Sequence, residues 1–201
     1  FGIIRASDLN ELFNTAKGFE NFPLPKGNRI AIVTNAGGPG ILAVDTLERE
    51  NLVLTDFGNR TKNLLRDIVH PEGSIDNPID LLPGGTAENF KNVIEIIAAD
   101  KNVDAIISIF VEPVMVAPFE VVENINSIQS DKPILQVVMP LPEFWNKYRK
   151  ESSRKLPLFK NPEDPTEVLS NMLFYSSSQK KLSENKKKYE SFLSLKPHKN
   201  S

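Results

Sequence analysis

The segment from residue 29 to residue 48, RIAIVTNAGGPGILAVDTLE, places the strongest constraint on the fold. Its apolar run, Ile30 to Val33, leads into a glycine-rich turn, and a stretch with helical spacing follows from about Pro39 to Glu50. Proline suits a first helical turn because its missing N–H would have no intrahelical partner there. A strand, a tight turn and a helix in this order predict the first half of a βαβ unit.

The same alternation continues to the end of the chain and predicts an α/β protein. Right-handed crossovers then give a doubly wound, mainly parallel sheet with helices on both faces. Extended or apolar runs are predicted at 52–57, 77–82, 103–110, 132–138 and 156–159, and helices at about 60–69, 86–100, 119–129, 141–152 and 164–181. Ligands of such sheets bind at the carboxyl ends of the strands, so the loops of interest are 34–40, 81–86, 110–117 and 138–142.

The chain is divided into three parts. Residues 1–27 are predicted to be a lead-in of a short strand, a helix N-capped by Ser7 and a proline-containing linker. Residues 28–178 form the sheet domain, and residues 179–201 form a basic C-terminal tail. The tail carries lysines at 180, 181, 186, 187 and 188. We interpret it as a solvated helix end rather than a nucleic-acid patch, since few aromatic residues lie among the lysines.

Composition narrows the class of protein. The net charge of −2 gives no general attraction to nucleic acid or to an anionic membrane. No apolar run approaches the ~20 residues that span a bilayer, and the absence of cysteine suits a reducing compartment. We therefore expect a cytoplasmic protein that binds neither nucleic acid nor membrane. Because the chain opens on Phe1, we also expect a fragment of a longer protein.

The glycine turn predicts an anion site, because a helix N-terminus directs free N–H groups and a positive dipole end to one point. Gly38, Gly40 and Ala43 also fit the G-x-G-x-x-A spacing of dinucleotide-binding oxidoreductases, and Asp56 lies where a ribose-binding acid is required. Pro39 disagrees with that fingerprint, as do the two residues between strand and glycines. The remaining alternative is that the glycines serve only a tight turn and close helix–sheet contact.

Three longer stretches together resemble the nucleoside-diphosphate-forming acyl-CoA synthetases. These enzymes include the ADP-forming acetate–CoA ligases and are related to succinyl-CoA synthetase. The stretches are RIAIVTNAGGPGILAVDTLE, GSIDNPIDLLPGGTAENFKNVIEIIAADKNVDAIISIF and LPLFKNPEDPTEVLSNMLFY, within a resemblance that covers residues 2 to 178. It implies the last, flavodoxin-like domain of the α-type chain.

The resemblance implies an acid–thiol ligase that interconverts acyl-CoA, ADP and phosphate with a carboxylic acid, ATP and CoA. An acyl phosphate forms, and a histidine then carries the phosphoryl group. That histidine is expected upstream of this chain, so no catalytic residue is assigned here, and His70 and His198 are interpreted as surface residues. ATP or ADP, Mg²⁺ and CoA are expected on partner domains, namely CoA-binding and histidine-loop domains and an ATP-grasp module. This domain alone is expected to bind no cofactor and no metal.

The same resemblance implies that this domain supplies an anion cradle made of helix N-termini. One begins near Pro39, a second follows PGGT and a third follows Phe110, where the glycine-rich loop of succinyl-CoA synthetase is replaced by Val111, Glu112 and Pro113. Thr86 is the expected cap of the second helix. Asn77 and Asp80 either serve the function, with Asp80 orienting a loop or accepting from the partner's histidine, or only cap and brace their turn. The candidate phosphate- or substrate-binding residues are Asn35, Gly37, Gly38, Gly40, Asn77, Asp80, Gly84, Gly85, Thr86 and Glu112. A non-catalytic regulatory or assembly module remains an alternative.

Overall fold

The computed structural model describes residues 2–113 and 116–194, with side chains as far as Lys187. Within these residues, six parallel strands form one sheet in the order β2-β1-β4-β5-β6, and β3 pairs with β1 outside this path. The strands are β1 (Arg29–Thr34), β2 (Val53–Leu54), β3 (Ile79–Asp80), β4 (Ala105–Val111), β5 (Ile134–Met139) and β6 (Leu158–Phe159). The predicted doubly wound α/β class is therefore confirmed.

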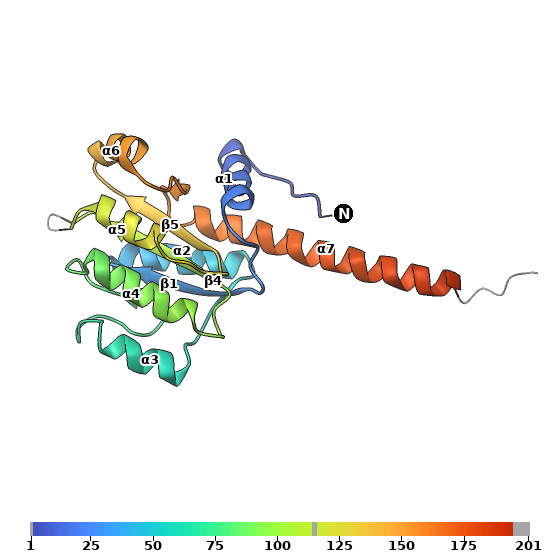
Figure 1. Cartoon of the computed structure of the whole chain (residues 1–201), viewed down its shortest axis with the longest axis horizontal. Coiled ribbons are helices and arrows are strands. Elements are labelled where there is room, and N and C mark those ends of the chain that lie inside the picture. The colour runs from blue at the N-terminus through green and yellow to red at the C-terminus, as the bar shows by residue number, and fades with distance from the viewer. Residues whose placement is uncertain (1, 114–115, 195–201) are drawn as a thin grey trace, which may run out of the picture.

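Helices cover both faces of the sheet (Figure 1). One face carries α3 (Asn59–Arg66), α4 (Ala87–Ala98), α5 (Pro118–Asn126) and α6 (Glu143–Glu151), which contact one another in sequence. The other face carries α2 (Gly37–Arg49) and the start of α7 (Asp164–Ser194). The central strands β4 and β5 are buried on both sides and mostly apolar because each face is covered by helices.

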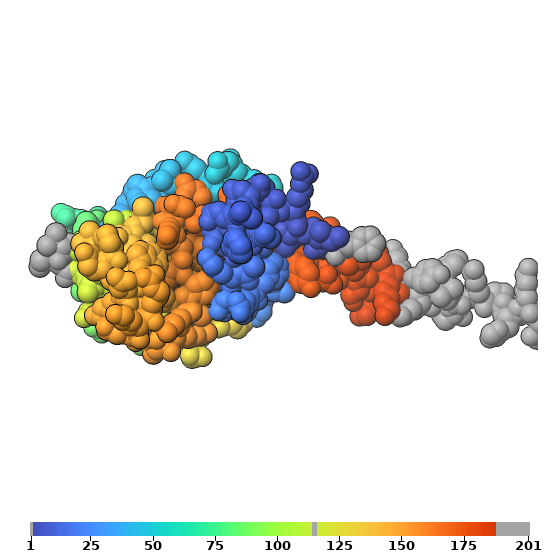
Figure 2. Space-filling model, turned by 90° about the horizontal axis from the view of Figure 1, so that it is seen from above, coloured from blue at the N-terminus to red at the C-terminus, as the bar shows by residue number. Residues whose placement is uncertain are grey.

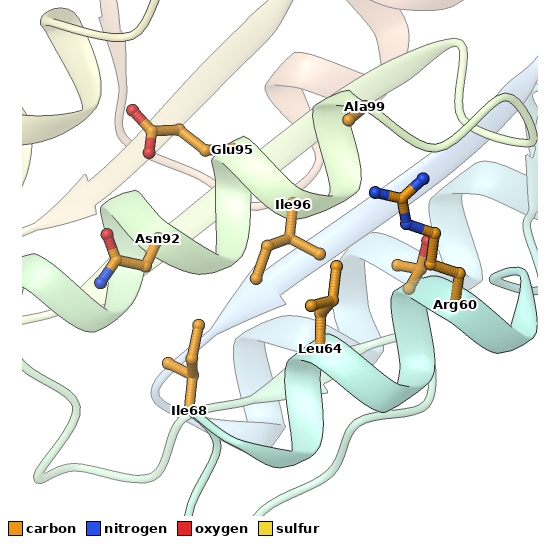
Figure 3. A pocket seen from close by; sticks show the side chains of 8 residues that line it. Arg60, Leu64, Ile68, Asn92, Glu95, Ile96 and Ala99 are labelled. Carbon is orange, nitrogen blue, oxygen red and sulfur yellow. The ribbon is translucent and has the colours of Figure 1, made fainter.

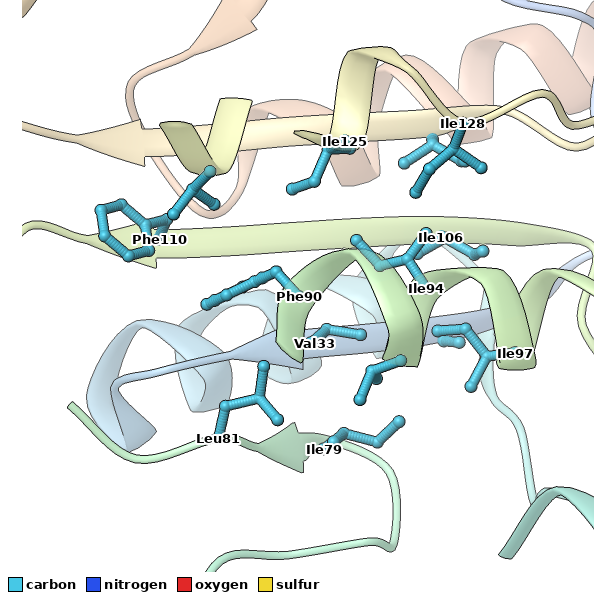
Figure 4. Packing of buried hydrophobic residues seen from close by; sticks show 14 of the residues in the cluster. Val33, Ile79, Leu81, Phe90, Ile94, Ile97, Ile106, Phe110, Ile125 and Ile128 are labelled. Atoms are coloured by element: carbon cyan, nitrogen blue, oxygen red, sulfur yellow. The ribbon is translucent and has the colours of Figure 1, made fainter. Parts of the chain in front are cut away.

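Two apolar clusters fill the spaces between the sheet and the helices. Figure 4 shows the larger cluster, in which Phe90 and Ile94 of α4 lie over Val33 of β1 and Ile106 of β4. The second cluster joins Ala43 and Leu47 of α2 to the opposite side of the sheet and to α7. Side-chain alternation along β1 supplies both clusters, since Val33 faces the first and Ile32 the second.

The edge beside β1 is shared by two short strands. Arg29 and Ile30 of β1 pair with β2, whereas Val33 and Thr34 pair with β3. Between these pairings the chain leaves the sheet for α3 and returns. Ile32 lies at the gap, and its N–H donates to Asn77 Oδ1 at 2.9 Å. A side-chain amide thus replaces the missing strand neighbour.

The lead-in differs from the prediction in two respects. Residues 2–8 form no strand, and α1 (Leu9–Asn21) is N-capped by Asp8, whose Oδ1 accepts from the N–H of Glu11. Ser7 instead donates to the Glu11 carboxylate through both its N–H and its hydroxyl. The helix packs on α7, where a Cβ at Gly18 would lie 2.4 Å from a methyl of Val168, so only glycine permits this approach.

The last helix is longer than predicted. α7 runs without interruption from Asp164 to Ser194, so the proposed division at residue 178 falls inside a helix. Figures 1 and 2 show its second half projecting away from the body of the protein. No helix in the described part of the chain is long and apolar enough to cross a membrane.

Candidate functional site at the carboxyl edge of the sheet

Four loops meet at the carboxyl edge of the sheet. Because the strands are parallel, β1, β3, β4 and β5 all end there, and each is followed by the N-terminus of a helix, respectively α2, α4, α5 and α6. The helices after β1 and β4 lie on opposite faces, so the crevice between these neighbouring strands is the topological switch point of the sheet. The candidate residues predicted from the sequence lie on these loops and the adjoining element ends, except Asn77, which precedes β3.

Asn35 lies in that crevice and links the two strands. Its side-chain Nδ2 donates to the carbonyl of Val111 at 2.8 Å, and its Oδ1 accepts from the Val111 N–H at 2.9 Å. The residue is only 2% exposed. The amide therefore extends the pairing of β1 with β4 beyond the end of β1, and both of its polar atoms are used inside the fold.

The glycine turn leads directly into α2. The N-cap is Ala36, which has no capping side chain, and the hydroxyl of Thr34 accepts from the Ala36 N–H at 3.0 Å. Within the described residues, the N–H groups of Gly37 and Gly38 donate no hydrogen bond. These two donors, at the positive end of a helix dipole, can bind an anion or a carbonyl-type oxygen.

The glycines of this turn differ in whether packing requires a residue without a side chain. A Cβ on Gly40 would lie 3.2 Å from Cγ2 of Thr34, so Gly40 allows α2 to approach β1 closely. A Cβ on Gly38 would meet nothing within 4 Å, and its φ is not positive. Packing and backbone conformation therefore explain Gly40 but leave Gly38 unexplained. Open space in front of Gly38 is compatible with close approach by a group from outside this chain.

Asp80 lies beside the start of α2. It ends β3 opposite Thr34, and its Oδ1 accepts from the Leu82 N–H at 2.8 Å, which holds Leu82 in a left-handed conformation with φ of 60°. Its Oδ2 is 3.9 Å from the position of a Cβ on Gly37. A carboxylate is favourable at a helix N-terminus, but it opposes a second anion there unless a proton donor lies between them.

Asn77 has a structural role at the neighbouring edge. In addition to accepting from Ile32, its Nδ2 donates to the carbonyls of Ile30 and Thr55 at 2.8 and 3.0 Å. The amide therefore bridges β1, the end of β2 and the return to β3. These contacts correspond to the bracing role that the sequence left as one of two alternatives.

The PGGT loop forms the N-terminus of α4. Thr86 caps this helix as predicted: its hydroxyl accepts from the Asn89 N–H, while Asn89 Oδ1 accepts from the Thr86 N–H. A Cβ on Gly85 would lie 2.7 Å from Cβ of Leu81, so glycine is required there, whereas Gly84 faces open space. The capping box uses the N–H groups of Thr86 and Asn89, whereas those of Ala87 and Glu88 donate no hydrogen bond within the described residues.

A cavity of about 410 Å³ adjoins this loop, and it is lined in part by His70, Leu82, Gly84 and Gly85. His70 is exposed, and its Nδ1 accepts from the Glu72 N–H at 3.2 Å. His70 is a surface residue, as expected, but its place beside the two glycines was not predicted. The contact depends on how the 67–78 segment returns to the sheet, which local sequence does not encode. His198 lies outside the described residues.

Glu112 belongs to the third loop and turns toward β5. Its carboxylate accepts from the Leu141 N–H, and its own N–H donates to the Met139 carbonyl at 3.2 Å. It lines a cavity of about 400 Å³ together with Phe119, Phe144 and Lys147. The carboxylate is thus directed to the loop before α6, on the side of the sheet that carries α5.

A separate groove lies away from these loops, between α3 and α4 (Figure 3). It encloses about 520 Å³, with Leu64, Ile68 and Ile96 on its floor and Arg60 and Glu95 at its rim. None of the predicted site residues lines it. Across residues 2–113 and 116–194, no group of three or more acidic or histidine side chains is arranged to hold a metal ion.

Charge pairing is concentrated at the opposite edge of the sheet. Arg29 Nε and Nη2 donate to Asp104 at 2.8 and 2.9 Å, at the amino ends of β1 and β4. These hydrogen bonds hold the pKa of the Asp104 carboxyl below its ordinary value, although partial burial opposes the shift. The pair stabilises the start of the two central strands and is remote from the candidate site.

Comparison with known proteins identifies the family. A model described as Ligase-CoA domain matches residues 30–141, which is more than half of this 201-residue chain. The chain therefore belongs to the Ligase-CoA domain family. The matched region includes every candidate site residue named above.

Individual relatives agree with this assignment. The α subunit of ADP-forming acetate–CoA ligase II of Pyrococcus furiosus is 32% identical over 171 residues, which cover 81% of this chain and 37% of that subunit. A solved protein of Pyrococcus horikoshii OT3 has a TM-score of 0.79 at 28% identity, covering 88% of this chain and 42% of that one.

A more distant structure shares the fold. It is the dinucleotide-forming acetyl-coenzyme A synthetase 1 of Ca. Korarchaeum cryptofilum, with a TM-score of 0.81 at 21% identity, covering 92% of this chain and 41% of that one. The chain spans about two fifths of the length of these relatives.

Proposed function

We propose that this chain is the Ligase-CoA domain of an ADP-forming acid–CoA ligase, which interconverts acyl-CoA, ADP and phosphate with a carboxylic acid, ATP and CoA. The name of the Pyrococcus furiosus relative and the family match support the reaction class. In this proposal the domain contributes binding and orientation, and the phosphoryl-carrying histidine belongs to another part of the enzyme. ATP or ADP with Mg²⁺, and CoA, would be bound by partner domains.

The observation that carries the proposal is the open N-terminus of α2. Gly37 and Gly38 offer two N–H donors without partners among the described residues, and a side chain at Gly38 would meet only open space. An acyl phosphate or a phosphorylated imidazole carries the negative oxygens that such donors stabilise. The donors are fixed before the anion arrives, so binding requires no reorganisation.

Asp80 gives this site a second property. With one oxygen held by the Leu82 N–H and the other near Gly37, its carboxylate is fixed beside the anion position. A neutral imidazole that enters between them can donate its N–H to the carboxylate and present its second nitrogen toward the donors of α2. In this role Asp80 orients a histidine of a partner domain and favours one tautomer.

Asn35, Asn77 and Gly40 are assigned positioning roles in this proposal. The first two hold the ends of β1 against β4, β2 and β3 through hydrogen bonds to backbone atoms. Gly40 sets the distance of α2 from the sheet. Gly84, Gly85 and Thr86, at the N-terminus of α4, and Glu112 remain candidates for contact with the acid or phosphate.

Gly38→Ala provides a direct test in the complete ligase. The new methyl group contacts nothing in this chain, and alanine is the better helix former, so stability is expected to stay the same or rise by up to about 1 kcal/mol. The methyl group projects into the space that the anion would occupy, so acyl-CoA formation from acid, ATP and CoA is expected to fall at least about tenfold, or ~1.4 kcal/mol of transition-state binding.

Glu48→Gln, an exposed change at the far end of the same helix, is the matched control and is expected to keep full activity. Wild-type turnover by Gly38→Ala would overturn the role of the α2 N-terminus. A complete protein that forms no acyl-CoA with any carboxylic acid tested would overturn the ligase assignment itself. That second result would favour the regulatory or assembly alternative.

A further inference from the structure

The second half of α7 is a solitary helix. From Gln179 to Lys187 every side chain is exposed, and Figures 1 and 2 show this part of the helix leaving the body of the protein. The contact with the lead-in nearest to this projecting part is made by Gly2, which lies beside Ser178 and Gln179. Most of the stability of helices in proteins comes from packing against other elements, so a projecting helix gains stability when a partner covers one of its faces.

One face of α7 carries opposite charges on either side of an exposed aromatic residue. Glu167, Phe174 and Lys181 are spaced by seven residues, which places each successive pair about 20° apart around the helix and all three within about 40°. This face points away from the sheet: Met172 on the opposite side is fully buried, and Phe174 is 51% exposed. The small, exposed side chain of Ser177 flanks Phe174 on the same side and leaves room for a second helix to approach there, whereas Ser170 donates to the Glu50 carbonyl and Ser178 lies beside Gly2.

We propose that α7 pairs with α7 of a second copy of this chain, in antiparallel orientation about a two-fold axis at Phe174. In this register Glu167 of each copy lies opposite Lys181 of the other, and the two Phe174 rings meet at the axis. Such an interface is isologous, so each pairing occurs twice. The register follows from the sequence of one helix, because the acid and the lysine are equally distant from Phe174.

The electrostatic surroundings of Glu167 support this partner. Burial raises the pKa of the Glu167 carboxyl, and the neighbouring carboxylates of Glu11, Asp164, Glu50 and Asp8 raise it further. Within the described residues neither Glu167 nor Lys181 takes part in an ion pair. The start of α7 thus carries unbalanced negative charge, and its projecting half carries positive charge. Antiparallel pairing brings each region of one copy onto the complementary region of the other.

A second copy explains more of these features than nucleic acid does. Nucleic acid would use the lysines but would be repelled by the acidic groups around Glu167, and it gives no reason for the seven-residue spacing. The symmetric arrangement uses both charges and Phe174 together.

Charge exchange on the full chain tests the proposal by sedimentation equilibrium over a concentration series. The wild-type chain is expected to dimerise, with weaker association at ~0.5 M salt, where the ion pairs are screened. Lys181→Glu and Glu167→Lys each replace two attractions with two repulsions, so each is expected to raise the dissociation constant at least about tenfold. The double variant restores both pairs with reversed sign and is expected to dimerise within about threefold of wild type.

Lys180→Glu is the matched control, since it makes the same charge change one residue away and about 100° around the helix. It is expected to change the dissociation constant less than about threefold. A monomeric chain at low salt would overturn the proposal. An equal effect of Lys180→Glu and Lys181→Glu, or a double variant that does not recover, would also overturn it.

The orientation is tested by single cysteines in this otherwise cysteine-free chain. Antiparallel pairing places the two copies of Ser177→Cys about 9 Å apart along the axis and the two copies of Lys187→Cys about 39 Å apart. A short bismaleimide is therefore expected to cross-link the first variant and leave the second unlinked. Cross-linking of Lys187→Cys with equal efficiency would indicate parallel pairing and refute the proposed register.

Discussion

Replacement of Asn77 by alanine tests how the split edge of the sheet is held together. The change removes three hydrogen bonds: the one from the Ile32 N–H to Oδ1 and the two from Nδ2 to the carbonyls of Ile30 and Thr55. Ile32 is fully buried, so its N–H cannot recover a partner from bulk water without local opening. Asn77→Ala is therefore expected to destabilise the protein while leaving the rest of the sheet intact.

The magnitude follows from which groups lose their only partner. A buried donor left unpaired at Ile32 costs about 1–3 kcal/mol. The Ile30 carbonyl keeps the Thr55 N–H at 3.1 Å, so its loss is partial, and each of the two remaining bonds contributes about 0.5–1 kcal/mol. The expected loss is about 2–5 kcal/mol, a large part of the stability of a typical domain.

Urea unfolding, followed by far-UV circular dichroism and by the fluorescence of Trp145, the single tryptophan, measures this loss. Asn63→Ala is a suitable control because Asn63 is an exposed asparagine whose side chain bonds only Arg66 in the described structure, and it is expected to change stability by less than about 0.5 kcal/mol. A stability of Asn77→Ala within that same range would refute the bracing role. Loss of ligase activity without loss of stability would instead assign Asn77 to ligand contact.

Two further predictions concern packing and pH. Gly40→Ala places a methyl group 3.2 Å from Cγ2 of Thr34, whose hydroxyl is held by Ala36. We expect urea unfolding to show a loss of stability of about 1 kcal/mol, opposite in sign to the effect of Gly38→Ala. Unchanged stability would contradict the close approach of α2. Asp104→Asn weakens the pairing with Arg29 and is expected to cost about 1–3 kcal/mol at neutral pH. Because the folded pKa of Asp104 lies below its unfolded value, the stabilisation is present above about pH 4 and is lost as the pH falls through the folded pKa. Parallel stability–pH curves for wild type and Asp104→Asn would contradict this assignment.

The sequence was sufficient to predict the fold class and the edge of the sheet that carries the candidate site. Buried strands such as β4 are marked by nearly continuous apolar residues, and α4 begins at the predicted cap, Thr86. These two features depend on residues that are close in the sequence and on burial, and the local pattern of apolar and polar residues indicates both. Once the strands are parallel, the loops that follow them must share one edge, so the positions of Asn35, Gly38 and Asp80 follow from the strand assignments.

The use of individual side chains could not be predicted in the same way. Asn77 lies 45 residues from Ile32, and Asn35 lies 76 residues from Val111, so the hydrogen bonds that define their roles form only after the strands have paired. His70 lies only 14 residues from Gly84, but its place at the cavity likewise depends on how the intervening chain returns to the sheet. An asparagine at the carboxyl end of a strand is equally suited to ligand binding and to bracing, and only its partners distinguish the two roles.

The long final helix is another feature whose role could not be predicted from the sequence alone. The lysines after residue 179 were predicted to lie on a solvated helix end, and their side chains are exposed as far as Lys187, but the predicted helix ended at about residue 181. In the structure α7 continues to Ser194, which turns the spacing of Glu167, Phe174 and Lys181 into a single continuous face. The seven-residue spacing was visible in the sequence. It indicates a shared exposed face only when the helix is known to extend across all three residues and when the side facing the sheet is known. For this reason the register of the proposed pairing is a stronger test than association alone: weak association through the lysines would also occur with other acidic surfaces, whereas recovery by the double charge exchange requires that Glu167 and Lys181 face each other.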